Sequence, residues 1–265
     1  MTRRLCLITG ASAGIGAAFA KVFASHGYDL ALTARRQDRL DAVAADLRLQ
    51  YGVETFSFAA DLADPAAPDR LLAFIESEGR VVDALVNNAG YGLPGTFAAT
   101  TWTDQRAFLQ VMATAPVELA HKTLPGMAAR RFGRIINVAS LAGLVPGSAG
   151  HTLYGATKSL LIKFSESLHQ ENLAVGVHVS ALCPGFTFSE FHDVNGTRDM
   201  MSNLPAWLWM GADEVASTGY EAVEANRAVC VPGAPNKSIA ALAKVLPDDW
   251  ALALMSREAG RFRKL

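Results

Sequence analysis

A tyrosine and a lysine stand four residues apart in the segment YGATK, at Tyr154 and Lys158. On a helix this spacing places both side chains on one face. Fourteen residues before the tyrosine, Ser140 ends the apolar run RIINVAS, which has the pattern of a buried strand. Ligands of open α/β sheets bind where strands end. We therefore interpret Ser140, Tyr154 and Lys158 as one catalytic set.

These residue types fit proton transfer at a carbonyl or hydroxyl oxygen. A phenol, with an ordinary pKa of about 10, is poorly matched to proton transfer at neutral pH. A nearby lysine ammonium favours the phenolate and lowers that pKa, and a serine hydroxyl can stabilise charge on the substrate oxygen. We expect Tyr154 to move the proton to or from the substrate oxygen.

A glycine-rich segment, TGASAGIG, follows the first apolar run directly and opens the first helical pattern. Glycines permit a tight turn and a close backbone approach. Free N–H groups and the helix dipole then favour a phosphate group. Between a first strand and a first helix, this pattern predicts a dinucleotide site. The predicted cofactor-binding positions of the loop are Gly10, Ser12, Gly14, Ile15 and Gly16.

The residues after the second strand indicate which dinucleotide binds. An acidic residue there would bind the ribose 2′-hydroxyl of NAD. This chain has Ala34, Arg35 and Arg36 instead. Arg35 can pair with a 2′-phosphate through a charge-assisted, bidentate contact; the alternative is that RRQDR is only a charged helix start. Because the acid is missing, we predict NADP as the cofactor and consider NAD the weaker alternative.

Short apolar runs alternate with helical periodicities along the chain. Strands that are apolar throughout, each followed by a helix, predict a parallel sheet covered on both faces. Right-handed crossovers then give a doubly wound α/β fold. We expect a single Rossmann-type domain over residues 1–265 with a seven-stranded, mostly parallel sheet. The predicted strands are 4–9, 29–34, 54–60, 83–88, 134–140, 176–183 and 228–232, and the predicted helices are 14–26, 37–50, 65–79, 103–130, 153–172, 212–225 and 236–246.

One long irregular stretch, about 184–211, contains the apolar cluster WLWM. Long loops in compact domains are often functional, so this stretch is predicted to be a flap over the substrate site. The alternative is a surface excursion that its tryptophans only anchor.

Composition excludes several classes of function. Hydrophobic residues make up 51% of the 265 residues and charged residues 18%, so a sizeable core is expected and disorder is not. The formal charge of −1 gives no general attraction to nucleic acid or an anionic membrane. No segment reaches the roughly 20 apolar residues of a membrane span, and the N-terminal run is attributed to the glycine loop rather than to a signal sequence.

The cysteines and histidines give no metal or disulfide pattern. Cys6, Cys183 and Cys230 lie in apolar runs without CxxC or Cys/His spacing, so buried reduced thiols in a cytoplasmic protein are expected. The six histidines form no HExxH or comparable pair, so no metal site is predicted. The C-terminal RKL is a poor peroxisomal signal and is expected to be a solvated tail.

Taken together and in order, these motifs resemble those of the short-chain dehydrogenase/reductase family, of the type with TGxxxGxG and YxxxK. The similarity covers nearly the whole chain. It implies that Lys158 also contacts the nicotinamide ribose, and that Tyr154 borders the cofactor. The motifs that carry it are TGASAGIG, DL at 61–62, NNAG at 87–90, Ser140, YGATK and PGFT at 184–187. Further cofactor contacts implied by the resemblance are Asp61 and Leu62 at the adenine, Asn87, Ala89 and Gly90 in the cleft, and Pro184, Gly185 and Thr187 by the nicotinamide and phosphates.

The resemblance also implies the partners. The substrate is expected to be a small carbonyl or alcohol compound, apolar or aromatic in view of LPAWLWM. A homodimer or homotetramer is expected to form through the helices near 103–130 and 153–172.

Met112 departs from the family pattern. The family usually carries an asparagine in a segment resembling QVNxxA, and alignment with LQVMATA places Met112 there. The asparagine is understood to hold a water that extends a proton relay, whereas the methionine sulfur accepts weakly and donates nothing. The relay could run by another route, such as Thr114 or a rearranged water. Gln110 is the only nearby amide that could replace the asparagine, and on a helix it points to a different face. Alternatively, turnover is slowed, or the protein is a cofactor-binding sensor.

Three functions follow from these observations. The first is an NADP-dependent oxidoreductase that acts on a carbonyl or alcohol and is expected to work, with or without impaired turnover, because Ser140, Tyr154 and Lys158 are all present. The second is a non-catalytic NADP-binding regulator, which only Met112 motivates. The third, a nucleotide-sugar epimerase on the same fold, is disfavoured because such enzymes usually carry a longer substrate domain.

Overall fold

The computed structural model describes residues 2–93, 95–150, 152–188 and 205–253. Its main sheet has seven strands in the order β3-β2-β1-β4-β5-β6-β9, and every neighbouring pair is parallel. The order reverses between β1 and β4, which creates the crevice where ligands of such sheets bind. The strands are β1 Leu5–Thr9, β2 Asp29–Ala34, β3 Thr55–Ala59, β4 Ala84–Asn87, β5 Gly133–Val138, β6 Val177–Leu182 and β9 Val229–Cys230.

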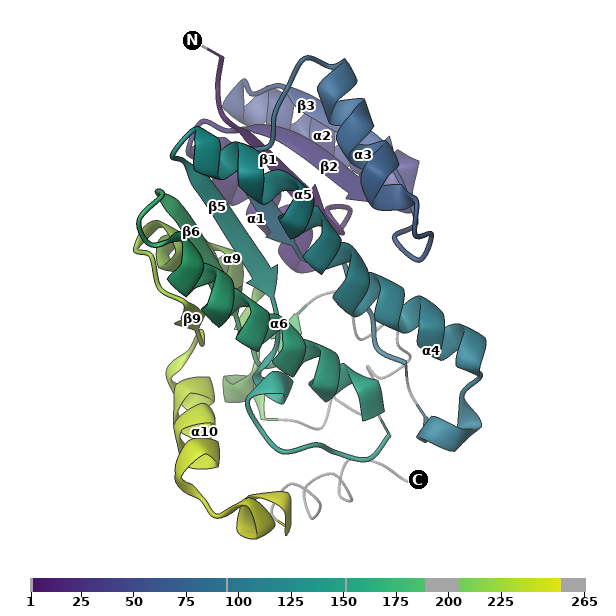
Figure 1. Cartoon of the computed structure of the whole chain (residues 1–265), viewed down its shortest axis with the longest axis vertical. Coiled ribbons are helices and arrows are strands. Elements are labelled where there is room, and N and C mark those ends of the chain that lie inside the picture. Colours follow the sequence, from purple (N-terminus) through teal and green to yellow (C-terminus); the bar gives the residue numbers. More distant parts are fainter. Residues whose placement is uncertain (1, 94, 151, 189–204, 254–265) are drawn as a thin grey trace.

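Helices cover both faces of this sheet, as Figure 1 shows. One face packs on α1, α2 and α9, and the other on α3, α5 and α6. The doubly wound Rossmann-type prediction is therefore confirmed. The helices are α1 Gly14–Ser25, α2 Gln37–Tyr51, α3 Ala67–Ser77, α4 Trp102–Leu109, α5 Ala115–Ala129, α6 Thr152–Asn172, α9 Ala212–Glu224 and α10 Ala234–Val245.

Alternation along the strands divides the core into two layers. In β1, Cys6 and Ile8 face the α1 side, whereas Leu5 and Leu7 face the α5 side, as the period of two in a strand requires. All these side chains are fully buried. The strand is therefore apolar from Leu5 to Ile8, which explains why its sequence shows a continuous run rather than alternation.

The predicted helix over 103–130 is not continuous. The α4 helix passes at Leu109 into a five-residue π-helix, Gln110–Thr114, and then into α5. Ala115 donates its N–H to the carbonyl oxygen of Gln110, five residues earlier. Pro116 has no N–H and cannot supply the next helical hydrogen bond. Such π-turns within α-helices often occur at functional sites, and this one contains Met112.

Part of the predicted flap is described. β7 Thr187–Phe188 and β8 Met210–Gly211 form a separate two-stranded parallel sheet. The remainder of the flap, 189–204, and the C-terminal RKL lie outside the described residues. That residues 1–265 form a single domain stays a prediction.

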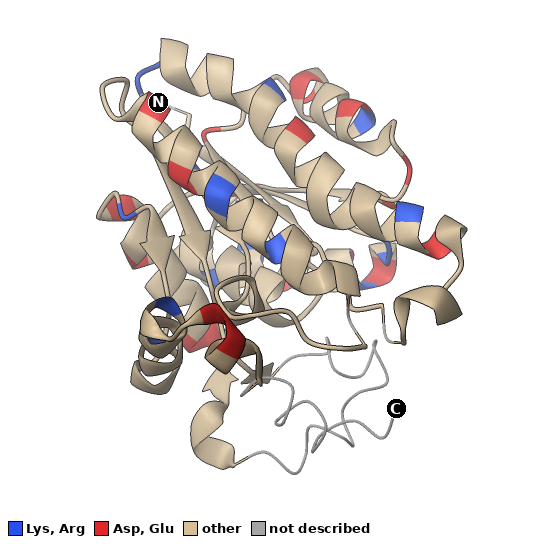
Figure 2. Ribbon diagram, turned by 60° about the horizontal axis from the view of Figure 1, so that its bottom comes forward, with Lys and Arg blue, Asp and Glu red and all other residues tan. Residues whose placement is uncertain are grey.

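Charged positions are interspersed over the described surface. In the view of Figure 2, both lysine or arginine and aspartate or glutamate positions are scattered along the helices. No helix among the described residues is long and apolar enough to cross a membrane. The three cysteines are buried and unpaired, as expected.

Candidate active site

The glycine loop connects β1 to α1 at the crevice of the sheet. Gly10 and Gly14 have φ angles of 67° and 55°, a left-handed conformation that glycine adopts without strain. The α1 helix begins at Gly14, and its first turn has neither a side-chain cap nor an acidic residue. Its terminal N–H groups are therefore available to an anion, as a dinucleotide pyrophosphate requires.

Gly16 is where the loop and α1 pack most closely. A Cβ atom at this position would lie 2.2 Å from the Gly10 carbonyl oxygen and 2.5 Å from Asn88 Nδ2. Asn88 in turn donates to the carbonyl oxygens of Thr9 and Gly10, at 2.9 and 3.2 Å. The Thr9 hydroxyl accepts from the N–H of Ala89 at 2.9 Å. These bonds join the ends of β1 and β4 and fix the shape of the loop.

Ser140 and Tyr154 are brought together as the sequence predicts. Ser140 follows β5, and its hydroxyl accepts from the N–H of Ala142 at 3.1 Å, which caps a short 3₁₀ turn. Tyr154 lies in the first turns of α6, partly buried, and its hydroxyl hydrogen-bonds the Ser140 side chain. A substrate oxygen bound by one of these hydroxyls is therefore within reach of the other.

Lys158 lies on the same helix, 5% exposed, with Nζ 5.8 Å from the centroid of the Tyr154 ring. Its Nζ donates to the carbonyl oxygen of Val138 at 2.7 Å. Burial lowers the pKa of Lys158 from its ordinary value to about 8.

One expectation about the pKa of Tyr154 is not met. Burial raises this pKa above its ordinary value, and only the hydrogen bond with Ser140 opposes the rise. The sequence suggested that the Lys158 ammonium would lower the pKa of Tyr154, and the structure does not show this effect. The physical reason is the burial of the phenol, while the Lys158 ammonium donates to the Val138 carbonyl and lies 5.8 Å from the centroid of the Tyr154 ring.

The carboxyl ends of β2 and β3 contribute the polar residues predicted to meet the adenosine. Arg35 is exposed at the end of β2, and Arg36 Nη2 donates to the Ser12 hydroxyl at 3.4 Å. Asp61 is exposed, and its Oδ1 accepts from the N–H of Ala63 at 3.0 Å, while Leu62 is buried. Both arginines are exposed, and Arg36 contacts the glycine loop.

Tyr91, which the sequence reasoning did not select, lies in the electrostatic field of the same region. Burial raises the pKa of Tyr91, the charge of Asp61 raises it further, and Arg35 lowers it. Its ring packs edge-on against Phe108, with centroids 5.4 Å apart.

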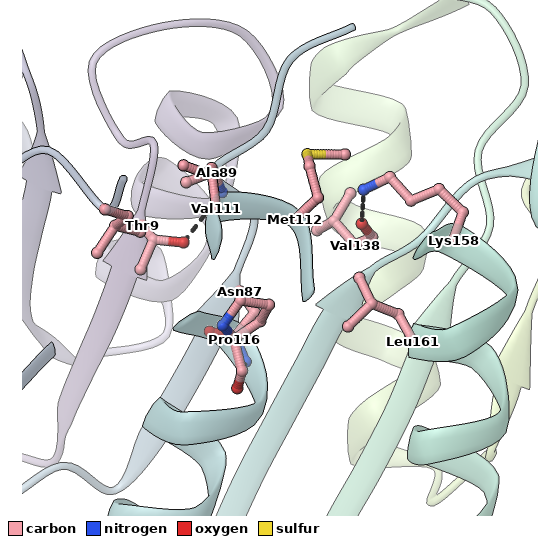
Figure 3. Close-up of a pocket in the computed structure, with 10 residues that line it drawn as sticks. Thr9, Asn87, Ala89, Val111, Met112, Pro116, Val138, Lys158 and Leu161 are labelled. Atoms are coloured by element: carbon pink, nitrogen blue, oxygen red, sulfur yellow. Dashed lines mark hydrogen bonds between the residues drawn. The ribbon is translucent and has the colours of Figure 1, made fainter. Parts of the chain in front are cut away.

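The NNAG segment braces the cleft. Asn87 Nδ2 donates to the carbonyl oxygen of Pro116 at 3.0 Å and to Asn137 Oδ1 at 2.8 Å, so it joins β4 to α5 and β5. A Cβ atom on Gly90 would lie 3.0 Å from the Met112 sulfur. Met112 itself is 1% exposed, and in Figure 3 it lies between Ala89 and Lys158. It therefore borders the predicted cofactor cleft.

The PGFT segment closes the other side of the site. The carbonyl oxygen of Pro184 accepts from the N–H of Leu141 at 2.8 Å, and Thr187 donates to the Gly185 carbonyl at 3.2 Å. A Cβ atom on Gly185 would lie 2.3 Å from Asn236 Oδ1 on α10. The segment is thus clamped between the 3₁₀ turn after Ser140 and α10.

Aromatic side chains cover the β7–β8 sheet next to this segment. The Trp209 ring stacks on the Phe188 ring, with centroids 4.8 Å apart. The Phe186 ring is tilted against the Trp209 ring, with centroids 5.6 Å apart. Phe188 and Trp207 are 57% and 66% exposed. This surface offers apolar contact area to a ligand.

Several residues of the site were not selected from the sequence. Thr9 and Asn88 adjoin selected positions, and their polar side chains at strand ends were the available signal. Arg36 was noted beside Arg35, but its reach to Ser12 depends on the start of α2. Asn236 carried no sequence signal, because only the packing of α10 places it against Gly185.

Comparison with known proteins decides the family. A model of the short chain dehydrogenase family matches residues 4–198. The chain belongs to this family. The match includes the glycine loop, Ser140, Tyr154 and Lys158, so the resemblance inferred from the motifs is confirmed.

Relatives and solved structures of this short-chain dehydrogenase agree with the assignment. The chain is 35% identical to nodulation protein G of Rhizobium sp. (strain N33), over 88% of this chain and 94% of that protein. It is 32% identical to an NADP-dependent 3-hydroxy acid dehydrogenase of Salmonella typhi, over 82% and 81%. A short-chain dehydrogenase from Sphingobium yanoikuyae, solved with NADPH, superposes with a TM-score of 0.80 at 31% identity, covering 92% and 96%. The protein is therefore an oxidoreductase of this family, and the non-catalytic regulator finds no support.

Proposed function

We propose that this short-chain dehydrogenase uses NADP(H) to interconvert a small carbonyl compound and the corresponding alcohol. The observation that carries the proposal is the hydrogen-bonded pair Ser140 and Tyr154, with Lys158 one turn further along α6 and the open glycine loop across the crevice. The residues proposed for proton transfer and those proposed for dinucleotide binding thus lie at the same edge of the sheet.

The residues present fit a dinucleotide. The uncapped start of α1 and the left-handed glycines suit a pyrophosphate. Arg35 and Arg36 supply cations where an acid would select NAD. The NADP-dependent relative and the NADPH-bound neighbour support the same choice.

Each catalytic side chain has a separate task. When bound, the nicotinamide supplies or accepts the hydride. In the reductive direction, Tyr154 donates its proton to the carbonyl oxygen and is left as a phenolate. The Ser140 hydroxyl hydrogen-bonds the same oxygen and stabilises the charge that develops there. Lys158 would hold the nicotinamide ribose and, if its ammonium turns from Val138, would stabilise the phenolate.

The substrate is proposed to carry an apolar or aromatic part. The aromatic surface of Phe186, Phe188 and Trp209 adjoins Thr187 and would contact such a part. The cytoplasmic location and the homodimer or homotetramer stay predictions.

A panel of aliphatic and aromatic ketones with NADPH tests the function. We expect the wild-type chain to oxidise NADPH in the presence of at least one ketone. Tyr154→Phe should reduce kcat by at least about 10²-fold, in line with the loss of a general acid, while the Kd for NADPH stays within about twofold, less than one hydrogen bond is worth. Retained turnover in Tyr154→Phe would contradict the assigned role.

A further inference from the structure

Asn236 on α10 packs directly on the backbone of Gly185, the glycine of the PGFT turn. A Cβ atom at Gly185 would lie 2.3 Å from Asn236 Oδ1 and 2.7 Å from both Cγ and Nδ2, so the whole amide group covers this position. The φ angle of Gly185 lies outside the left-handed region. The glycine is therefore needed here for the close approach of the amide rather than for its backbone conformation.

The orientation of the Asn236 side chain is fixed by two acceptors. Its Nδ2 donates to the carbonyl oxygen of Pro232 at 2.9 Å and to the sulfur of Met210 at 3.5 Å. Both partners accept hydrogen bonds, so the nitrogen must face them. The side chain is 3% exposed, and burial of an amide is costly without such partners. The amide is therefore held in one place on Gly185.

Each of the first three residues of the turn is held by a different segment. The carbonyl oxygen of Pro184 accepts from the N–H of Leu141 at 2.8 Å, and that of Phe186 accepts from the N–H of Met210 at 3.0 Å. The α10 amide packs on Gly185 between them. A glycine loses more conformational freedom on ordering than any other residue, so the turn depends most on an outside contact at this position.

This contact joins two different parts of the chain. The PGFT turn lies inside residues 4–198, which match the short chain dehydrogenase model, whereas α10 begins at Ala234, after β9 (Figure 1). A C-terminal helix outside the match therefore determines how much room the turn has.

We propose that Asn236 is a positioning residue that holds the PGFT turn in contact with the nicotinamide half of NADPH. The inference rests on the proposed function, in which this turn borders the nicotinamide. Without the amide, Gly185 moves into the space that the side chain leaves, and the turn loses its fixed position. The adenosine half, which is proposed to bind at the ends of β1 and β2, does not depend on this contact.

Titration with two ligands separates this role from a general loss of structure. NADPH carries the nicotinamide half, whereas 2′-phospho-AMP lacks it and keeps the adenosine and the 2′-phosphate. In Asn236→Ala, we expect the Kd for NADPH to rise about five- to tenfold, the effect of one well-placed interaction. The Kd for 2′-phospho-AMP should stay within about twofold, less than one hydrogen bond is worth. An equal rise for both ligands, or no rise for either, would overturn the proposal.

Ser238→Ala is the matched control. Ser238 is exposed on the same helix, and its hydroxyl donates to the Ala234 carbonyl at 3.1 Å. This variant should bind both ligands as the wild type does. A rise in the Kd for NADPH as large as that in Asn236→Ala would assign the effect to the helix as a whole and would overturn the role of the amide.

A double variant tests the contact itself. Gly185→Ala alone should weaken NADPH binding about fivefold or more, because its methyl group meets the amide, and residues in contact couple by such amounts. In the Asn236→Ala background the methyl group has space, so the same change should cost at most about twofold. Losses that simply multiply in the double variant would contradict the proposal.

A crystal structure of the wild-type NADPH complex decides if Asn236→Ala does not fold. We expect the PGFT turn within about 4 Å of the nicotinamide ring, with Asn236 packed on Gly185. A turn without contact to the ring would overturn the proposal.

These readouts distinguish failure of this inference from failure of the proposed function. None of them needs turnover, so a chain that reduces no ketone can still support the role of Asn236. A wild-type chain that binds neither ligand would overturn the cofactor assignment and the inference with it. Tight binding of NADPH by the wild type and by Asn236→Ala alike would overturn the inference alone.

Discussion

Lys158 combines a functional charge with almost complete burial. Its ammonium is removed from water and donates a hydrogen bond to the carbonyl oxygen of Val138 at 2.7 Å. Desolvation lowers its pKa to about 8. The charge therefore costs folding free energy, as functional groups buried in active sites often do.

Replacing this lysine by methionine should stabilise the fold at neutral pH. The pKa of Lys158 falls from 10.5 unfolded to about 8 folded, which corresponds to roughly 3 kcal/mol as an upper bound for Lys158→Met at pH 7. The unfolded chain binds more protons between these two values, so the wild type gains stability as the pH rises through that window. The advantage of Lys158→Met should therefore shrink between pH 8 and 10.

Urea unfolding of both proteins at pH 7, 8, 9 and 10 measures this difference. A difference in unfolding free energy between the two proteins that does not change with pH would contradict the lowered pKa of Lys158 in the folded chain. Lys163→Met, at an exposed lysine on the same helix, is the control and should show no such trend.

The catalytic residues could be predicted from the sequence, whereas the direction of the pKa shift of Tyr154 could not. Ser140, Tyr154 and Lys158 were selected because their spacing defines a strand end and one helix face. The direction of the Tyr154 pKa was predicted wrongly, because it is set mainly by the burial of the phenol, which depends on tertiary packing. Asn236 could not be selected, since its contact with Gly185 joins segments about 50 residues apart.

At the scale of elements, the glycine loop and α1 are one packed unit. Apolar periodicity predicted nearly every element, because strands apolar on both faces and amphipathic helices differ in period. The π-helix at Gln110–Thr114 was not predicted, because its hydrophobic pattern is that of an ordinary helix. Pro116 was the available signal, but whether a proline changes the hydrogen bonding of a helix depends on the turn that precedes it.

Gly16→Ala should disrupt this unit. The added methyl group would lie 2.2 Å from the Gly10 carbonyl oxygen, a backbone atom that cannot move without shifting the loop. We expect a loss of about 1–3 kcal/mol in unfolding free energy and weaker binding of NADPH, as measured by urea unfolding and fluorescence titration.

Gly147→Ala is the matched control, because a Cβ atom there meets nothing within 4 Å. It should leave both quantities nearly unchanged. If Gly16→Ala bound NADPH as tightly as the wild type, the close packing of the loop would not be needed for the cofactor.

At the scale of the whole molecule, cofactor binding should stabilise the fold. The proposed site draws on the ends of β1, β2, β4 and β5, so a bound dinucleotide links elements across the crevice. The parallel topology was predictable from the order of strands and helices. The β7–β8 sheet was not, because two-residue strands give no periodicity.

NADPH should therefore stabilise the chain more than NADH does. At one hundred times its Kd, a ligand adds about 2.7 kcal/mol to the unfolding free energy. In Arg35→Ala/Arg36→Ala, thermal shifts with the two cofactors should become similar, because the cations opposite the 2′-phosphate are gone. Arg106→Ala, which removes an exposed arginine on α4, should keep the preference. Equal shifts in the wild type would contradict the choice of NADP.

The most direct test of the central claim follows the transferred hydride itself. NADPH carrying deuterium at the transferring position is incubated with a ketone from the panel, and the alcohol is analysed by mass spectrometry. We predict that the wild-type chain produces alcohol with one deuterium on carbon and that Tyr154→Phe, still saturated with NADPH, produces at least about 10²-fold less of it in the same time. A wild-type chain that binds NADPH but transfers no deuterium to any ketone would contradict the account.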